Sequence, residues 1–341
     1  MPDATNRYTD VVISGLAHVD APHVVSSDAI DIELSDVLER LRLRPGFLAK
    51  VAGIQERRVW DVGTVPSTPA AEAGQRALER SGVAPGSVGL LVNTSVSRDY
   101  VEPSTASIVH GRLGLGPDTM NFDLGNACLG FVNGMQVIAS MISRGEIDHG
   151  LVVNAESSRF AVESTIARLR RAPDPAVFRE QFATLTLGSG AVAMVLSSAR
   201  LAEGPRFLGG LSRAATKHAH LCTGQLDEMR TDAQGLLLAG LELAALTWKE
   251  AVGLFDWVAD RFRLYAMHQV SSVHTRAVVE ALGIDAARLP LIYPRYGNIG
   301  PAGVPTVLSK AAEEGVVRRG DRVALMGIGS GINATAAEVL W

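Results

Sequence analysis

The chain has 341 residues, of which 47% are hydrophobic and 20% charged, and a formal net charge of -4. This length suits two ordinary domains or one large duplicated domain with a full apolar core. The slightly acidic balance offers no basic surface for nucleic acid, and no run of about 18 uncharged apolar residues could span a bilayer. The polar start lacks the apolar segment of a signal peptide, and two distant cysteines fit a reducing compartment. We therefore expect a cytoplasmic protein with no nucleic-acid partner and no integral membrane segment.

The first half alternates strand and helix patterns. Residues 10–16 and 88–92 are apolar runs that predict strands, and residues 31–51 suit helical segments interrupted at Pro45. A face of small residues predicts a helix from Thr68 to about Ser81, and Pro103 can open another helix. Strands are expected at 120–124 and 150–155, with a helix at 131–142 between them. This alternation predicts a layered α/β fold.

Residues 156–184 form the most charged part of the chain. One interpretation is a solvated surface excursion. The other is a helical cap or subunit contact near a functional site.

The second half of the chain repeats a sequence pattern of the first half. Residues 186–196 and 322–340 each read as strand, Gly-Ser-Gly turn and strand, which indicates an internal duplication with a seam near residue 200. We expect one half at residues 1–200 and the other at 201–341. Between the repeats, residues 234–262 predict a long helix, 264–267 a short strand, and 272–282 and about 301–314 further helices.

Cys128 stands where a predicted strand turns into a predicted helix. Gly125 and Gly130 flank it and allow a sharp bend and a close approach by a substrate. The positive end of the helix macrodipole would lower the pKa of a thiol placed there, as in a nucleophile. The alternative is a small buried hydrophobe, because free cysteine is often buried.

Four other positions are candidates on local grounds, each with a plainer alternative. His268 follows a predicted strand and precedes a helix with caps at Ser271 and Ser272, but a lone histidine can be structural. Asn298 lies in a Gly- and Pro-rich loop, where it can be an ordinary turn residue. The glycines of 327–331 permit backbone N–H donation to an oxyanion, and Glu102 can be an exposed acidic cap. The Lys-His-Ala-His stretch at 217–220 lacks companion ligands, so no metal is expected, and Cys222 is expected to be structural.

Together these residues resemble the thiolase superfamily. Asn-Ala-Cys-Leu-Gly at 126–130, His-Gln-Val-Ser at 268–271 and Gly-Asn-Ile-Gly-Pro-Ala at 297–302 are most similar to its ketoacyl synthase III branch. Within that branch, the motifs at 101–106, 154–159 and 327–333 resemble the OleA family of long-chain olefin biosynthesis. The resemblance covers essentially the whole chain. It implies a duplicated thiolase-like α/β fold, layered α-β-α-β-α with mixed sheets.

The resemblance also implies an activity. OleA-like enzymes join two fatty acyl-CoAs by a Claisen condensation without decarboxylation, which yields a 2-alkyl-3-keto acid and releases CoA. By resemblance, Cys128 carries the first acyl group as a thioester, and His268 and Asn298 face the enolate oxygen. The backbone N–H groups of Cys128 and Ser330 would form the oxyanion hole. Glu102 would act as the base on the site of the neighbouring subunit of a homodimer.

The resemblance leaves two other functions open. A decarboxylative 3-oxoacyl-ACP synthase III would take malonyl-ACP or malonyl-CoA and would need no base, and a non-catalytic acyl-binding or partner subunit would need no chemistry. No cofactor is expected, because the CoA thioesters are substrates, and enzymes of an olefin pathway are expected to act on the product. Val51 stands where the ketoacyl synthase III pattern has an arginine that contacts CoA, so no CoA-binding residue is assigned.

Overall fold

The computed structural model describes residues 4–341. Within them, ten strands form one mixed sheet that consists of two half-sheets. The first half-sheet has the order β2 (Val11–Asp20), β8 (Gly190–Ser198), β7 (His149–Glu156), β5 (Leu90–Asn93) and β6 (Met120–Asp123). The second has the order β12 (Phe262–Met267), β13 (Arg322–Gly329), β14 (Asn333–Leu340) and β9 (Arg206–Ala214), with β1 (Thr5–Arg7) beside β9.

The two half-sheets are joined where Val12 of β2 pairs with Arg206 of β9, next to a hydrogen bond from Ile13 N to Pro205 O at 2.7 Å. The pairs β5–β6, β5–β7 and β12–β13 are parallel, and β2–β8, β7–β8, β13–β14 and β9–β14 are antiparallel. Strands β7 and β8 are buried along almost their whole lengths, as strands covered on both faces must be.

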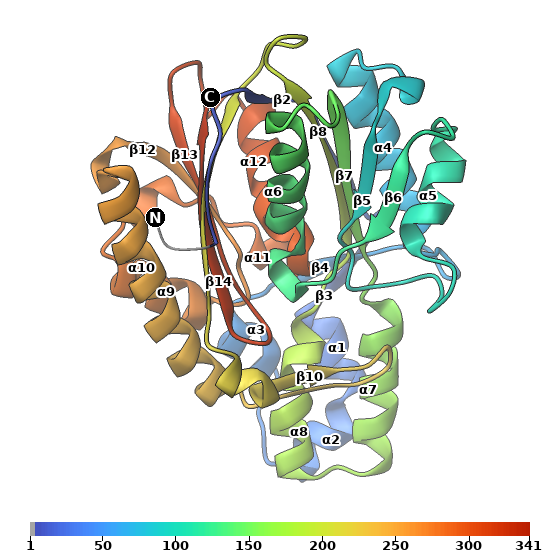
Figure 1. Cartoon of the computed structure of the whole chain (residues 1–341). Helices are drawn as coiled ribbons and strands as arrows, with labels where there is room; N and C mark the ends of the chain where they lie inside the picture. Colours follow the sequence, from blue (N-terminus) through green and yellow to red (C-terminus); the bar gives the residue numbers. More distant parts are fainter. Residues whose placement is uncertain (1–3) are drawn as a thin grey trace.

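Helices cover both faces of each half-sheet, as Figure 1 shows. The central pair, α6 (Gly130–Ser143) and α12 (Gly303–Glu313), packs between the half-sheets in the largest apolar cluster. On the outer face of the first half-sheet lie α4 (Ser67–Ser81) and α5 (Thr105–Leu113), and on that of the second lie α9 (Ala233–Phe255) and α10 (Ser272–Leu282). The layered α-β-α-β-α architecture expected from the sequence is therefore confirmed.

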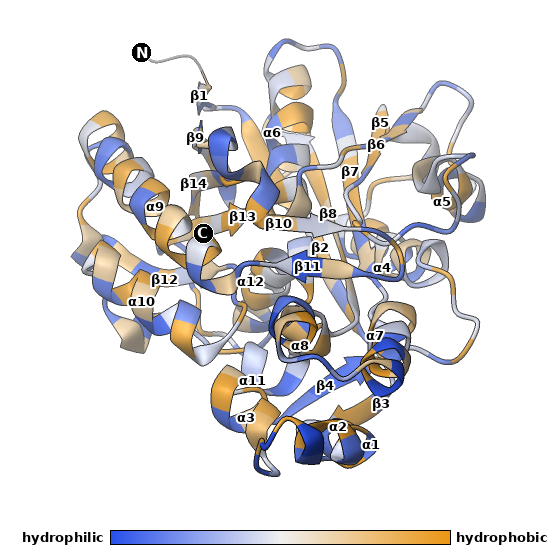
Figure 2. Cartoon of the chain, turned by 90° about the horizontal axis from the view of Figure 1, so that it is seen from below, coloured by the Kyte–Doolittle hydropathy of each residue, from blue (hydrophilic) through white to orange (hydrophobic). Residues whose placement is uncertain are grey.

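A helical cap closes one end of these layers. It contains α1 (Ser27–Glu33), α2 (Ser35–Arg40), α3 (Phe47–Ala52), α7 (Arg159–Arg171) and α8 (Pro175–Gln181). Ile166, Leu169 and Phe178 of the charged segment are buried against Leu34 and Val37. Figure 2 shows α1, α2, α7 and α8 side by side, with hydrophobic stretches between hydrophilic ones. The segment is thus a helical unit with an apolar face, not a solvated excursion.

Short elements connect these parts. The hairpins are β3 (His23–Ser26) with β4 (Glu56–Val59) and β10 (Cys222–Gly224) with β11 (Met229–Thr231). The remaining helix is α11 (Tyr293–Tyr296). The 3-10 turns are η1 (Pro85–Ser87), η2 (Ala127–Leu129), η3 (Phe182–Thr186), η4 (Thr216–Leu221), η5 (Ala259–Arg261), η6 (Ala286–Arg288) and η7 (Gly300–Ala302).

Three predicted elements differ from the structure. Pro103 does not open a helix, because α5 begins at Thr105 and Ser104 is its N-cap. The long helix ends at Phe255, not at 262, because Asp256 takes a left-handed conformation (φ 53°) and turns the chain toward β12. The predicted strand before the Gly-Ser-Gly of the first half is instead the 3-10 turn η3, and β8 begins only at Gly190. None of the helices in residues 4–341 has the length and hydropathy to cross a membrane.

Candidate active site

Cys128 lies in the 3-10 turn η2, between strand β6 and helix α6, where the sequence predicts a strand-to-helix junction. The preceding residue, Ala127, has φ 43°, a left-handed backbone that residues with a Cβ rarely adopt. Such a conformation persists only where the surroundings enforce it, and it is often found at functional sites. The thiol is therefore presented on a tight, strained turn.

The turn between β13 and β14 lies against the backbone of Cys128. A Cβ atom added to Gly329 would lie 3.5 Å from the Cys128 nitrogen and 3.4 Å from the Asn126 carbonyl oxygen. Ser330 begins this turn, and neither its N–H nor that of Cys128 donates to a backbone carbonyl in the loops of residues 4–341. Two unused backbone donors thus belong to adjoining loops.

His268 follows β12, as predicted, and its backbone N–H donates to the Met326 carbonyl at 2.9 Å. The side chain is buried. A Cβ atom added to Gly327 would lie 3.4 Å from the His268 Cβ and would also contact Leu129, the residue after Cys128. Burial, and to a smaller extent His274, lowers the pKa of His268 to about 3. The imidazole is therefore neutral near pH 7 and has a nitrogen that can accept a proton.

Asn298 lies in the loop between α11 and η7, and η7 packs against the η2 turn of Cys128. Its backbone N–H donates to Thr186 O, and its carbonyl accepts from Gly188 N, both at 2.9 Å. Its side-chain oxygen accepts the Gly300 N–H at 2.9 Å. Among residues 4–341 nothing accepts a hydrogen bond from its Nδ2 group. The amide is thus held by its oxygen while its N–H donors stay available.

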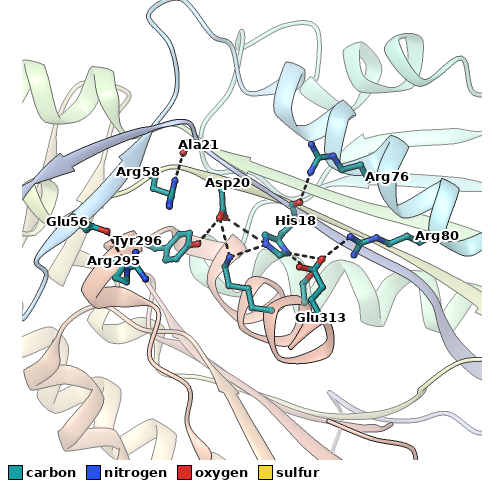
Figure 3. A network of polar contacts seen from close by, with 12 residues as sticks. His18, Asp20, Ala21, Glu56, Arg58, Arg76, Arg80, Arg295, Tyr296 and Glu313 are labelled. Carbon is teal, nitrogen blue, oxygen red and sulfur yellow. Dashed lines mark hydrogen bonds and ion pairs between the residues drawn. The ribbon is translucent and has the colours of Figure 1, made fainter. Parts of the chain in front are cut away.

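A polar network fixes the other end of the Asn298 loop (Figure 3). The Tyr296 hydroxyl donates to Asp20 Oδ2 at 2.8 Å, and Lys310 Nζ donates to the same oxygen at 3.2 Å. Lys310 also lies 3.1 Å from His18 Nε2 and over the Tyr296 ring. Strand β2 and helix α12 therefore both hold Tyr296, which directly precedes Gly297 and Asn298.

The thiol of Cys128 departs from the sequence prediction. Burial raises its pKa to about 12, and the nearby Glu156 and Cys222 add to the rise. The prediction of a lowered pKa is wrong, because dense protein surroundings disfavour the thiolate more than the helix terminus favours it. The resting nucleophile is therefore a protonated thiol that needs a proton acceptor during attack.

Glu156, at the end of β7, is a buried carboxylate near the site that the sequence analysis did not single out. It accepts hydrogen bonds from the backbone N–H groups of Val96 and Ser97, at 2.9 and 3.1 Å, and from the Ser97 hydroxyl at 2.9 Å. Burial nevertheless raises its pKa to about 7. It anchors the start of the loop at 94–104.

Glu102 lies farther along this loop, on an exposed stretch with Tyr100 and Val101. In residues 4–341 its carboxylate makes no hydrogen bond and no ion pair. Asp99 fixes the middle of the loop by accepting the Ser67 N–H at 2.8 Å, and Asp123 fixes its end by accepting the N–H groups of Thr105 and Ala106. Of the predicted residues, Cys128, His268, Asn298 and Ser330 adjoin through shared neighbours, whereas Glu102 projects from the surface.

Cys222 lies beside this site, which its sequence context did not indicate. The Ser330 hydroxyl donates to the Cys222 sulfur at 3.4 Å, and the sulfur also lies 3.4 Å from Thr231 Oγ1. Cys222 begins the β10–β11 hairpin, and 108 residues separate it from Ser330.

A cavity of ≈ 20 Å³ adjoins His268 between α9, α10 and the second half-sheet. Apolar side chains form most of its lining, including Trp248, Met267, Val278 and Leu282. Apolar surface is thus present directly against the candidate catalytic histidine.

Comparison with known proteins defines the class. Residues 122–210 match the 3-oxoacyl-[acyl-carrier-protein] synthase III family, and residues 256–341 match the C-terminal family of the same enzymes. The chain is thus a thiolase-superfamily acyltransferase of the synthase III type.

Individual relatives identify a narrower family within this class of acyltransferases. An acyl-CoA:acyl-CoA alkyltransferase from Xanthomonas campestris is 46% identical over 98% of this chain and 99% of its own length. One from Shewanella oneidensis is 36% identical over 98% of this chain and 100% of its own length. A crystal structure of a cysteine-to-serine variant of X. campestris OleA, with bound lauric acid and lauroyl-CoA, matches with a TM-score of 0.94 and 46% identity over 98% of this chain and 100% of that one. The chain belongs to the OleA family of acyl-CoA:acyl-CoA alkyltransferases.

Proposed function

We propose that this protein catalyses the non-decarboxylative Claisen condensation of two fatty acyl-CoAs to a 2-alkyl-3-keto acid, through an acyl thioester on Cys128. The observation that carries the proposal is the convergence of three groups. A protonated thiol, a neutral imidazole and an amide with free N–H donors lie on segments that pack around η2. Two relatives that cover 98% of this chain, at 46% and 36% identity, are acyl-CoA:acyl-CoA alkyltransferases.

In the first step, the Cys128 sulfur attacks the thioester carbonyl of one acyl-CoA. The thiol proton moves to His268. With a pKa of about 3, this histidine is neutral before the transfer and releases the proton readily afterwards. The negative charge that develops on the carbonyl oxygen is stabilised by the unused N–H groups of Cys128 and Ser330. The bond from carbon to the CoA sulfur then breaks, and CoA leaves with the proton.

In the second step, a carboxylate takes a proton from the α-carbon of another acyl-CoA. The donors of His268 and Asn298 stabilise the enolate oxygen. The α-carbon attacks the acyl group on Cys128, which forms the carbon–carbon bond and breaks the bond to sulfur, and the sulfur regains a proton from the protonated carboxylate. Water then cleaves the remaining CoA thioester and gives the keto acid. A plain acyl chain cannot lose carbon dioxide, so this route requires a base, and Glu102 is the proposed one.

Glu102 acts on the site of the neighbouring subunit in this proposal. The exposed carboxylate accompanies a group of exposed apolar residues, Val62, Val96, Tyr100, Val101 and Phe160. The chain segments that carry these residues are connected, because Arg159 donates to Trp60 O and Ser97 to Ser157 O. Among the described residues, strand β6 is an edge strand of the sheet, and its Asp123 accepts hydrogen bonds at the end of the Glu102 loop. An open edge beside exposed apolar residues favours pairing with a second copy of the chain.

The proposed reaction also determines which cofactors, later enzymes and cellular compartment we expect. Condensation and hydrolysis are redox-neutral, so no cofactor is required, and the CoA thioesters are substrates. A β-keto acid loses carbon dioxide readily, which favours its consumption by later enzymes of an olefin pathway. We place the reaction in the cytoplasm, where acyl-CoAs are available.

Purified protein tests the proposal when it is incubated with myristoyl-CoA. Steady release of CoA without any malonyl thioester supports the condensation, whereas release only with malonyl-CoA or malonyl-ACP supports a decarboxylative synthase III. Absence of an acyl adduct on Cys128 by mass spectrometry would favour a non-catalytic acyl-binding or partner subunit.

Two variants separate the steps and the subunits. Glu102→Ala should form the acyl adduct on Cys128 but give no condensation product. Mixed dimers of Glu102→Ala and Cys128→Ala subunits should regain condensation, because one subunit supplies the base and the other the thiol. Failure of the mixture while both variants form dimers would contradict action between subunits.

A further inference from the structure

A chain of three side-chain hydrogen bonds runs from the C-terminal half of the protein into helix α6. Asn333 Nδ2 donates to Asn126 Oδ1 at 3.3 Å, although 207 residues separate the two. Asn126 Nδ2 donates to Asn133 Oδ1 at 2.6 Å, and Asn133 Nδ2 donates to Gln136 Oε1 at 2.9 Å. All three bonds point the same way, so each polarises the next.

The first bond of this chain joins the two loops of the candidate oxyanion hole. Asn126 is two residues before Cys128, and Asn333 is three residues after Ser330. These loops are in close backbone contact, because a Cβ on Gly329 would lie 3.5 Å from the Cys128 nitrogen. The Asn126–Asn333 bond thus connects the segments that carry the two unused N–H donors.

Each loop also has a strained residue directly beside its asparagine. Ala127 has φ 43° and Ile332 has φ 53°, and neither is glycine. Left-handed residues with a Cβ hold their conformation only where neighbouring contacts enforce it. Asn126 precedes Ala127 and Asn333 follows Ile332, so the bond between their side chains is placed to hold both turns.

We propose that Asn126 and Asn333 are positioning residues that fix the separation of the Cys128 and Ser330 N–H groups, and so set the strength of the oxyanion hole. This inference rests on the proposed acyl transfer to Cys128. Neither asparagine touches the reacting atoms. Oxyanion stabilisation is sensitive to donor placement, because the donors must lie at hydrogen-bond distance from an oxygen that becomes charged only in the transition state.

Two reactions of the same thiol test the role. Acylation by myristoyl-CoA passes through an oxyanion, whereas alkylation by iodoacetamide displaces iodide and forms none. We expect Asn333→Ala and the near-isosteric Asn333→Leu to slow acylation by about tenfold or more, the direction seen when an oxyanion-hole donor is lost. Alkylation should stay within about twofold, since the thiol and its surroundings are unchanged. Gln75→Ala, which removes an exposed amide contact to Glu79 on α4, is the matched control and should change neither rate.

A double variant tests whether the two asparagines act as one unit. Asn126→Ala with Asn333→Ala should slow acylation no more than the stronger single variant, because both remove the same bond. Additive losses, an unchanged acylation rate in the single variants, or equal losses in acylation and alkylation would each overturn the inference. A lack of acylation in the unsubstituted protein would instead overturn the proposed function, and this inference with it.

Discussion

Gly188 offers a direct way to displace Asn298 without changing it. Its N–H donates to the Asn298 carbonyl at 2.9 Å, and its α-carbon faces the backbone of Tyr296. A Cβ at Gly188 would lie 1.8 Å from the Tyr296 carbonyl oxygen. Gly188→Ala must therefore push the backbone of the Asn298 loop away from β8.

The size of the required backbone movement determines the expected loss of reaction rate and of stability. The contact must lengthen from 1.8 Å to at least 3.0 Å, an increase of about 1.2 Å, and the obstructing atom belongs to backbone that cannot rotate away. Misplacement of a reacting group by about 1 Å costs on the order of 100-fold in rate. Overpacking of this kind also costs about 1–3 kcal/mol of stability. We expect condensation to fall about 100-fold, while acylation of Cys128, which does not use the Asn298 amide, falls much less.

The assay compares CoA release at steady state with the rate of the acyl adduct on Cys128, and thermal unfolding reports folding. Gly190→Ala is the matched control, because its Cβ would meet only Ile299 Cδ1 at 3.7 Å, an ordinary contact. A folded Gly188→Ala protein that condenses as fast as Gly190→Ala would refute the assigned role of the Asn298 loop.

Three further predictions concern the ionisable groups. Because the pKa of Cys128 is raised to about 12, its alkylation by iodoacetamide should accelerate about tenfold per pH unit from about pH 7 to about pH 10, and a plateau near pH 8 would contradict this assignment. Burial raises the pKa of Glu156 from 4.5 to about 7, so the folded state binds this proton more tightly than the unfolded state does. Its contribution to the free energy of unfolding should be present below about pH 4.5 and lost as the pH rises through about 7. Urea unfolding of Glu156→Gln at several pH values should not show this loss of stability. If the unfolding free energies of the variant and the unsubstituted protein changed in parallel with pH, the prediction would be contradicted. Asp123→Ala removes the acceptor for two N–H groups at the start of α5 and should lower stability by about 1–2 kcal/mol, whereas exposed Asp118→Ala should not, as thermal unfolding can check.

Local patterns were sufficient to place the central residues. The change from alternating to helical periodicity around Cys128 places it at the junction that the structure contains. His268 follows a short apolar strand, and Ser271 caps the next helix by accepting the His274 N–H at 3.2 Å. These features depend on a few neighbouring residues, so a single sequence reveals them.

Features set by tertiary packing could not be predicted in this way. The raised pKa of Cys128 comes from burial and from Glu156, which is brought near by strand pairing. Cys222 contacts Ser330 although 108 residues separate them, and Asn126 contacts Asn333 across the two halves. The apolar pattern of α9 continues past Phe255, and only the left-handed Asp256 shows where the helix ends. The roles of the site residues, the homodimer and the boundary near residue 200 stay predictions.

In the proposed reaction, one fatty acyl chain is bound to Cys128 while a second is deprotonated without loss of carbon dioxide. Mass spectrometry of the products formed from myristoyl-CoA as the sole substrate tests it most directly. We expect a β-keto acid that contains the carbon atoms of both chains, together with the ketone formed as it decays. A keto product that arises only with a malonyl thioester, and never from myristoyl-CoA alone, would contradict it.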